Sequence, residues 1–261
     1  MSDGWRALSA HQAAVARPFL DARERERRHL VVYLSGAHAY GFPSPDSDLD
    51  LKCVHVAPTR ELVRLEPGGD TAEAMEVVDG VELDYGSNEL GPVLRGVVKG
   101  NGNYLERLLG ELVLAADVAW LDDARAVVRP LLSRRVARHY VGFARSQLEL
   151  FDKTSTAKRA LYVLRTAATG RHLLATGELV TDIARLGAYI PGEVGELVAV
   201  KLRGEREALP AETANAWRGR LVAAIAAVDR GVAASMLPAE PDAAAVAAAD
   251  DWLVEVRRAA W

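Results

Sequence analysis

The sequence of 261 residues predicts an α/β domain over residues 1–118, followed by an all-helical domain over residues 119–261. Three observations lead to this prediction. Short apolar segments bounded by Gly, Pro and Asp occur in the first third of the chain, as strands require. Helical periodicity dominates after Glu89. Hydrophobic residues make up 50% of the chain, which is ordinary for a globular protein with a large core.

The first third of the chain contains a helix and several strands in our reading. Residues 5–29 have an amphipathic pattern that predicts a helix, and LVVYLSG then indicates a buried strand that ends in a glycine turn. After the loop FPSPDSD, the alternating segment DLDLKCVHV predicts a second strand. The segment EVVDGVELDYG contains Asp79-Gly80, a dipeptide typical of a tight turn between two short strands.

The rest of the chain is predicted to be helical, and strands largely disappear. Apolar residues at 90, 94, 97 and 98 share one helical face, and another helix begins near Leu105 after the turn KGNGN. Breaks such as GAYIPGE and MLPAEPD separate the later helices. We expect these helices at 134–151, 156–177, 193–206, 212–235 and 242–258.

Composition excludes several classes of protein. The net charge of −4 argues against a uniformly basic coat on nucleic acid. A single cysteine, Cys53, can form neither an intramolecular disulfide nor a cysteine-clustered zinc site, and we expect it to be buried and inert. The N-terminus lacks the pattern of a signal peptide, and the apolar run at 221–228 is too short to span a bilayer. We therefore expect a cytoplasmic protein with no membrane role.

The charge is distributed unevenly along the chain. Residues 36–91 hold twelve acidic residues and three basic ones, a net charge of −9. Residues 134–171 hold nine basic residues and two acidic ones, a net charge of +7. Single-signed helix faces in solvent explain such segments equally well. The functional interpretation is a divalent metal held by the acidic part and phosphates held by the basic part.

Two carboxylates in the segment SGAHAYGFPSPDSDLDL form the strongest chemical signal. Asp48 and Asp50 are two positions apart at the start of a predicted strand, so their side chains leave the same face. Such a pair suits Mg²⁺ or Mn²⁺, although isolated Asp-x-Asp pairs also occur in solvated turns. Upstream, Ser35-Gly36 is expected to open a helix or tight turn, where backbone N–H groups can contact phosphate oxygens.

A predicted strand is followed first by Ser-Gly and then by Ser-Asp-Leu-Asp-Leu. In this order of motifs the sequence resembles the DNA polymerase beta-like nucleotidyltransferase superfamily. The longer stretches SGAHAYGFPSPDSDLDLKCVHVAP, KGNGNYLERLLG and AKRALYVLRTAATGRHLLATGEL further resemble its RNA-repair-associated predicted nucleotidyltransferase subgroup. Together they cover about a third of the chain. The resemblance implies a small mixed sheet flanked by helices, and hence an α/β (α+β) nucleotidyltransferase-like domain before the helical one.

The resemblance also implies three catalytic carboxylates. Asp48 and Asp50 would bind two metal ions, Mg²⁺ or Mn²⁺, and a third carboxylate would complete the site and activate the attacking hydroxyl. Glu82 and Asp84 share one strand face, so alternation does not choose between them. We prefer Asp84, which lies nearer the strand end before Gly86. The implied reaction transfers a nucleoside monophosphate from an NTP such as ATP and releases pyrophosphate.

Nucleotide contacts are expected from both parts of the chain. Ser35 and Gly36 are the candidates in the first part. In the second part, Lys158, Tyr162 and Arg165 follow helical spacing on one polar face, and the subgroup resemblance passes through them. A stripe of cations there could bind the outer phosphates of the nucleotide.

The sequence does not identify the acceptor of the nucleotidyl group. The resemblance suggests a short RNA end, while a protein side chain or another small molecule with a hydroxyl or phosphate stays open. The superfamily usually has Gly, Ser or Thr after the signature glycine, and this chain has Ala37. That departure motivates an alternative function, a nucleotide-binding regulatory module with lost or weak turnover. A helical scaffold with acidic residues merely on its surface is the third interpretation.

Overall fold

The structure is a computed structural model that describes residues 4–261 except 69, 205 and 206. Its elements follow the chain in the order η1 (Gly4–Ala7), α1 (Ala10–Glu26), β1 (Arg28–Leu34), α2 (Gly36–Tyr40), β2 (Leu49–Val56), α3 (Thr59–Leu62), β3 (Thr71–Val78), β4 (Val81–Glu89), α4 (Leu90–Val98), α5 (Gly102–Leu109), β5 (Val113–Ala116), α6 (Val118–Val128), η2 (Arg129–Leu131), α7 (Val136–Thr154), α8 (Ala157–Thr176), η3 (Ile183–Tyr189), α9 (Gly195–Arg203), α10 (Ala211–Ala233) and α11 (Ala243–Ala259).

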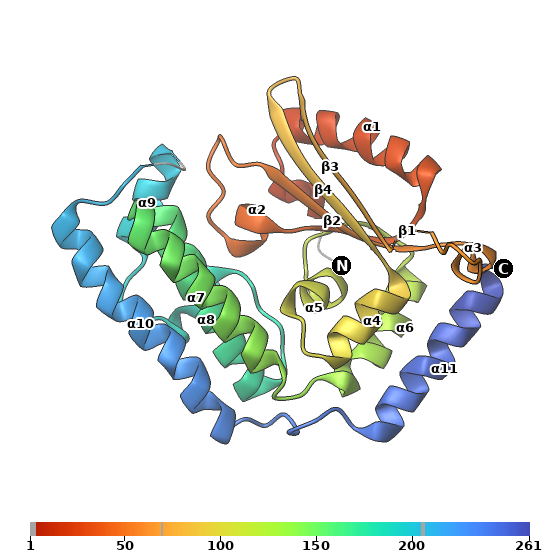
Figure 1. Ribbon diagram of the computed structural model, residues 1–261. Coiled ribbons are helices and arrows are strands. Elements are labelled where there is room, and N and C mark those ends of the chain that lie inside the picture. Colours follow the sequence, from red (N-terminus) through yellow and green to blue (C-terminus); the bar gives the residue numbers. More distant parts are fainter. Residues whose placement is uncertain (1–3, 69, 205–206) are drawn as a thin grey trace. The chain divides into compact units, whose positions relative to one another are not determined.

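Five strands form one mixed sheet in the order β3-β4-β2-β1-β5. β2 and β4 are parallel, and the remaining neighbours are antiparallel. Helix α1 packs on one face of the sheet, whereas α4 and α5 pack on the other (Figure 1). Leu34, Leu49 and Leu83 are fully buried in the core on the α1 side, because alternation points them away from the polar residues of the same strands. The predicted α/β fold with a mixed sheet is confirmed.

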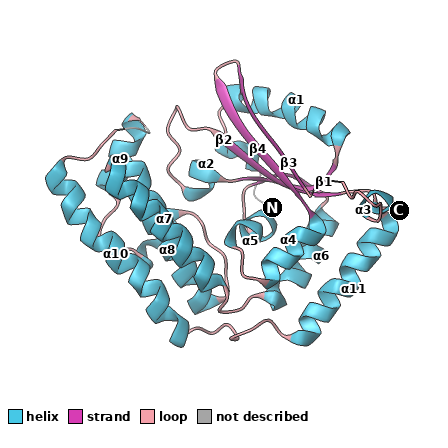
Figure 2. Cartoon of the chain, in the orientation of Figure 1, coloured by secondary structure: helices cyan, strands magenta, loops and turns pink. Residues whose placement is uncertain are grey.

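The chain forms two compact units. The first comprises Met1–His38, Asp48–Leu132 and Pro241–Trp261 and contains the whole sheet. The second comprises Ala39–Ser47 and Ser133–Glu240. Its described residues form helices and contribute no strand to the sheet (Figure 2). These units differ from the expected division between residues 118 and 119. The physical reason is that α6 packs against β1, and α11 packs against α4 and α6.

Most predicted elements lie within a few residues of the observed ones. The predicted hairpin turn is present, with left-handed backbone at Asp79 (φ 48°) and Gly80 (φ 78°). The helix expected over 5–29 begins later, at Ala10, because Ser9 caps it. The last two residues of the helix expected over 193–206 lie outside the described residues.

One short strand that was not expected, β5, occurs after Glu89. This four-residue strand, VLAA, pairs antiparallel with β1 at the edge of the sheet. It is too short, and too rich in alanine, to give a strand pattern of its own. Helix α6 follows it directly and was not expected as a separate element.

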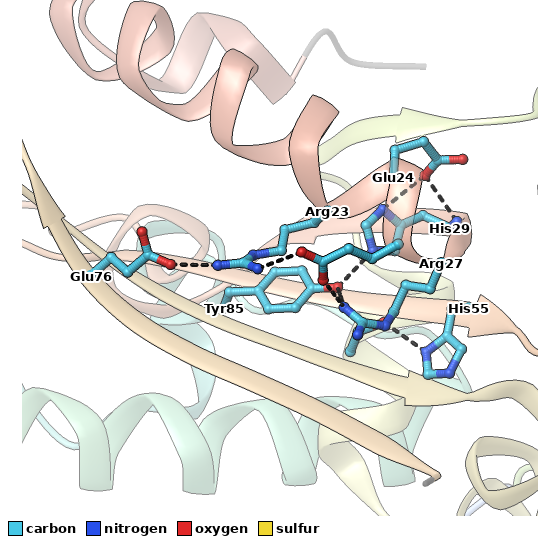
Figure 3. A network of polar contacts seen from close by, with 9 residues as sticks. Arg23, Glu24, Arg27, His29, His55, Glu76 and Tyr85 are labelled. Carbon is cyan, nitrogen blue, oxygen red and sulfur yellow. Dashed lines mark hydrogen bonds and ion pairs between the residues drawn. The ribbon is translucent and has the colours of Figure 1, made fainter. Parts of the chain in front are cut away.

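A polar network joins the end of α1 to the sheet (Figure 3). Arg23 forms ion pairs with Glu26 of its own helix and Glu76 of β3. Burial lowers the pKa of His29 to about 4, so its ring is neutral near pH 7. The backbone N–H of His29 donates to the Glu24 carboxylate at 2.9 Å, and the ring Nε2 forms a hydrogen bond of 2.7 Å with the Tyr85 hydroxyl. Because the ring is neutral, the approach of its Nδ1 to Glu24 is not an ion pair.

Helix α11 is fastened to the first unit by a buried ion pair. The Glu89 side chain is 1% exposed and accepts from the backbone N–H of Gly91 at 2.7 Å, which caps α4. Arg257 of α11 donates from Nη2 to Glu89 Oε2 at 2.5 Å, and its Nη1 pairs with Oε1. This buried ion pair explains why α11 belongs with the sheet.

Cys53 lies in the buried core on the α1 side, and burial raises the pKa of its thiol to about 12. Among the described residues, no helix is both long and apolar enough to cross a membrane.

Candidate functional site

Gly36 brings the end of β1 against the carboxylate of Asp50. The backbone N–H of Ser35 donates to the Asp50 carbonyl at 2.8 Å, and Gly36 then begins α2 with φ +64°. A Cβ atom at Gly36 would lie 1.8 Å from Asp50 Oδ2. Only glycine therefore allows this backbone conformation and the close approach of the carboxylate together. The expected helix opening at Ser35-Gly36 is present.

The register of the parallel strands pairs Asp50 with Asp84. These residues lie directly opposite each other in β2 and β4, so their side chains leave the same face of the sheet. Asp48 precedes β2 and lies close enough to influence the ionisation of Asp50. Glu82 is exposed and pairs with Val77 of β3 instead. Of the two expected alternatives, Asp84 is therefore the carboxylate next to Asp50.

Lys52 lies between the carboxylates of Asp50 and Asp84. Its Nζ is 2.7 Å from Asp84 Oδ1 and 3.8 Å from Asp50 Oδ1, and it also donates to the Asp84 carbonyl at 3.3 Å. Lys52 was not among the residues expected from the sequence. The signal was present, because Lys52 follows Asp50 by two positions and alternation puts both side chains on one face.

The site disfavours a charged carboxylate at Asp50. Burial, and then the neighbouring charge of Asp48, raise the pKa of Asp50 to about 7, while Lys52 opposes this shift. Asp84 raises it further by its charge and by a hydrogen bond to the Asp50 side chain. A cation bound beside these groups would remove the cost of ionisation.

The donors at this site are hard oxygens, which fit Mg²⁺ or Mn²⁺. In the part of the chain that the structure describes, no three His, Cys, Asp or Glu side chains form a ready-made metal cage. The ammonium of Lys52 instead supplies positive charge at Asp84 and Asp50. Lys52 contacts one oxygen of each carboxylate, Oδ1, so a bound metal would share these two groups with the ammonium.

The expected cationic residues lie on α8 in the second unit. Lys158 and Tyr162 are half-buried, whereas Arg165 is only 2% exposed. The polar face expected on this helix is therefore largely buried at Arg165. The Arg165 guanidinium lies 3.5 Å from the ring centroid of Tyr40, and Tyr162 packs edge-on against Tyr40 and Phe42. These aromatic rings, from the segment after Gly36, cover the face that the helical pattern suggested was open.

A buried lysine holds the segment that leads to Asp48. Lys201 of α9 is fully buried, and its Nζ donates to the hydroxyls of Ser44 and Ser47, the latter at 2.9 Å. Ser44 also donates to Asp46 at 2.6 Å. All four residues belong to the second unit. No sequence signal pointed to Lys201, because its partners lie more than 150 positions away along the chain.

Three comparisons relate the chain to known proteins. The model of the RlaP family, described as the RNA repair pathway DNA polymerase beta family, matches residues 14–255. The uncharacterized protein MJ0002 of Methanocaldococcus jannaschii is 30% identical over 159 residues, which are 59% of this chain and 64% of the relative. The chain thus matches less than two thirds of that relative's length. A crystal structure of a nucleotidyltransferase-like protein from Exiguobacterium sibiricum is similar with a TM-score of 0.34 and 10% identity, over 86% of this chain and 75% of the other.

Proposed function

Because the chain belongs to the RNA repair pathway DNA polymerase beta family, we propose that it transfers a nucleoside monophosphate from an NTP to an acceptor hydroxyl or phosphate and releases pyrophosphate. The observation that carries this proposal is the register that pairs Asp50 with Asp84, while Gly36 lies against Asp50. This arrangement gathers acidic oxygens at one point on the sheet, as phosphoryl transfer requires.

In this proposal, Asp48, Asp50 and Asp84 hold the catalytic metal. Bound Mg²⁺ or Mn²⁺ would supply the positive charge that stabilises the transferring phosphoryl group and the leaving pyrophosphate. Asp84 accepts the proton of the attacking hydroxyl. Its position supports this role, because Asp84 lies opposite Asp50 and is half-buried. Lys52, released from the carboxylates, becomes available to an anionic substrate.

We further propose that Ser35 and Gly36 of the first unit contact the NTP and, as a separate proposal for the second unit, that Lys158, Tyr162 and Arg165 of α8 contact phosphate groups. Gly36 supports the first role through its close backbone approach, and the half-buried Lys158 supports the second because its ammonium can pair with phosphate oxygens. Arg165 is held rigidly against Tyr40, which would reduce the entropy lost on binding.

The acceptor in this proposal is an RNA end. Its support is the description of the matching family, which names RNA repair. The positive charge of residues 134–171 suits a short strand, whereas the net charge of −4 is unsuited to coating long nucleic acid.

A radiolabel transfer assay with Mg²⁺, NTPs and an RNA pool tests the proposal. We expect Asp48→Asn and Asp50→Asn to reduce transfer by at least a hundredfold. Asp84→Asn should do the same, while the matched variant Glu82→Gln, on the same strand face, should retain activity. If wild type and Asp50→Asn are equally silent across all NTPs and RNA ends, the transferase proposal is wrong.

Ala37 favours a second candidate function, a nucleotide-binding regulatory module with lost or weak turnover. Its methyl side chain is buried and brings no hydroxyl to the position after Gly36. Under this alternative, calorimetry detects metal-dependent NTP binding, but no pyrophosphate is formed with any acceptor. Pyrophosphate release that depends on Asp84 would exclude it.

A further inference from the structure

A cavity of about 410 Å³ lies beside Asp84, on the face of the sheet that carries the carboxylates. It is built entirely within the first unit, from β2, β3, β4 and α5. Its polar and flexible lining residues are Lys52, Glu73, Met75, Asp84, Asn88 and Arg107. None of the residues expected from the sequence to bind the nucleotide lines it.

Arg107 brings a positively charged guanidinium to this cavity, where the other charged groups are the ammonium of Lys52 and the carboxylates of Glu73 and Asp84. Its Nη1 donates to the carbonyl of Cys53 at 3.0 Å and to the side-chain oxygen of Asn88. Within the described ranges, its Nε and Nη2 have no acceptor, and no carboxylate pairs with the guanidinium. Burial lowers the pKa of Arg107, yet a guanidinium stays protonated in proteins. A half-buried arginine without a carboxylate is a ready partner for a phosphate.

Met75 adds an apolar wall next to the reacting groups. It lies directly opposite Asp84 in the register of β3 and β4, so the two side chains share one face of the sheet. The Met75 residue is 71% exposed, so its flexible apolar side chain is accessible to a ligand. A thioether beside a phosphate-binding guanidinium offers contacts for a base and a phosphate together, which are the two parts of a nucleotide.

The strand order puts this cavity and Gly36 on opposite sides of Asp50. In the order β3-β4-β2-β1, the cavity lies on the β3 and β4 side of Asp50, whereas Gly36 follows β1 on the other side. A ligand in the cavity therefore reaches Asp84 first, the carboxylate to which we assign the acceptor proton.

We infer that this cavity binds the terminal nucleotide of an RNA acceptor, with a backbone phosphate on Arg107, the base against Met75 and the hydroxyl at Asp84. The assignment rests on the proposed nucleotidyl transfer and specifies where its acceptor lies. Asn88 acts as a positioning residue, since its side-chain oxygen accepts from Arg107 and so orients the guanidinium.

The test measures acceptor and nucleotide binding separately on the full chain. Fluorescence anisotropy with a labelled single-stranded RNA oligonucleotide that ends in a 3′-hydroxyl reports the acceptor, and calorimetry with Mn²⁺ and a non-hydrolysable NTP reports the nucleotide. Met75→Glu places a negative charge at an exposed position, so the variant should fold. Val77→Glu is the matched control, because Val77 is 68% exposed on the same strand face but outside the cavity.

We expect Met75→Glu and Arg107→Met to weaken RNA binding about tenfold and Val77→Glu by less than twofold. Arg107→Lys should retain part of the RNA affinity, because lysine keeps the positive charge but cannot form the bidentate hydrogen bonds of a guanidinium. Arg107→Met should also reduce the slope of log affinity against log salt by about 0.7, the value for one phosphate contact on a single strand. NTP binding should stay within twofold of wild type in all four variants.

Two outcomes overturn the assignment. If Arg107→Met weakens NTP binding and spares RNA binding, the guanidinium serves the triphosphate and the acceptor lies elsewhere. If the wild-type protein binds the NTP but Met75→Glu and Arg107→Met bind RNA as tightly as wild type, the cavity assignment fails while the proposed function stands. A third outcome separates the two proposals: if the wild-type protein binds no NTP but these two variants bind RNA more weakly than wild type, the proposed function fails while the cavity remains an RNA-binding site.

Discussion

Replacement of Gly36 by alanine should separate the stability of the fold from the function of its carboxylates. The backbone there has φ +64°, a conformation that costs an alanine about 1–2 kcal/mol. In addition, the new Cβ would lie 1.8 Å from Asp50 Oδ2, whereas ordinary contact begins near 3.4 Å. The carboxylate must therefore move by about 1.6 Å, away from its place beside Asp84.

The expected effect on activity is much larger than the effect on stability. A misplacement of about 1 Å in a catalytic group can reduce the rate by about a hundredfold. We therefore expect Gly36→Ala to lower the free energy of unfolding by about 1–2 kcal/mol and nucleotidyl transfer by at least a hundredfold. Mn²⁺ affinity, measured by calorimetry, should fall in parallel because the metal ligand is displaced.

Gly80→Ala in the turn between β3 and β4 is the matched control. Gly80 has φ +78°, and nothing lies within 4 Å of the Cβ it would gain. It therefore carries the backbone cost alone, and its Mn²⁺ affinity should equal that of wild type. If the two alanine variants lose stability equally and both keep wild-type Mn²⁺ affinity, the close approach of Gly36 and Asp50 has no role in metal binding.

Three further predictions concern the buried polar groups. Burial lowers the pKa values of His29 and His55 to about 4, so acidification from pH 6.5 to 4 should lower the free energy of unfolding by up to about 3 kcal/mol per histidine. Denaturant titration at several pH values measures this dependence. If the free energy of unfolding of His29→Asn depends on pH as steeply as that of wild type, the prediction is wrong. Lys201→Met should lower the free energy of unfolding by about 1–3 kcal/mol, because it removes two buried hydrogen bonds from the ammonium to Ser44 and Ser47, and a melting temperature equal to wild type would refute that role. Arg257→Met should cost about 3–5 kcal/mol by leaving the Glu89 carboxylate buried alone, and adding Glu89→Gln should recover part of the loss.

The sheet and its carboxylates could be predicted because they depend on local order along the chain. Alternation in DLDLK fixes which side chains share a face, and the parallel register then selects Asp84 over Glu82 as the neighbour of Asp50. The same alternation could have identified Lys52. The register itself was not predictable, since it depends on how β2 and β4 align across the intervening hairpin.

The remaining features depend on contacts between distant parts of the chain. Arg107 is 54 positions from the carbonyl it contacts, and Arg257 is 168 positions from Glu89. Helical spacing placed Arg165 on a polar face, but it could not reveal that Tyr40 covers this face. Strand β5 was missed because four residues carry too little periodicity.

The place of α11 in the first unit has a consequence for synthesis of the protein. The ribosome synthesises α11 only after residues 133–240 of the second unit. The sheet is therefore complete before the helix that packs against its unit has been made. At about 5–20 residues per second, the delay is of the order of ten seconds. During this time the Glu89 carboxylate lacks its arginine, and the nascent first unit offers a surface that a chaperone could bind. The unit that begins first is thus the one that finishes last.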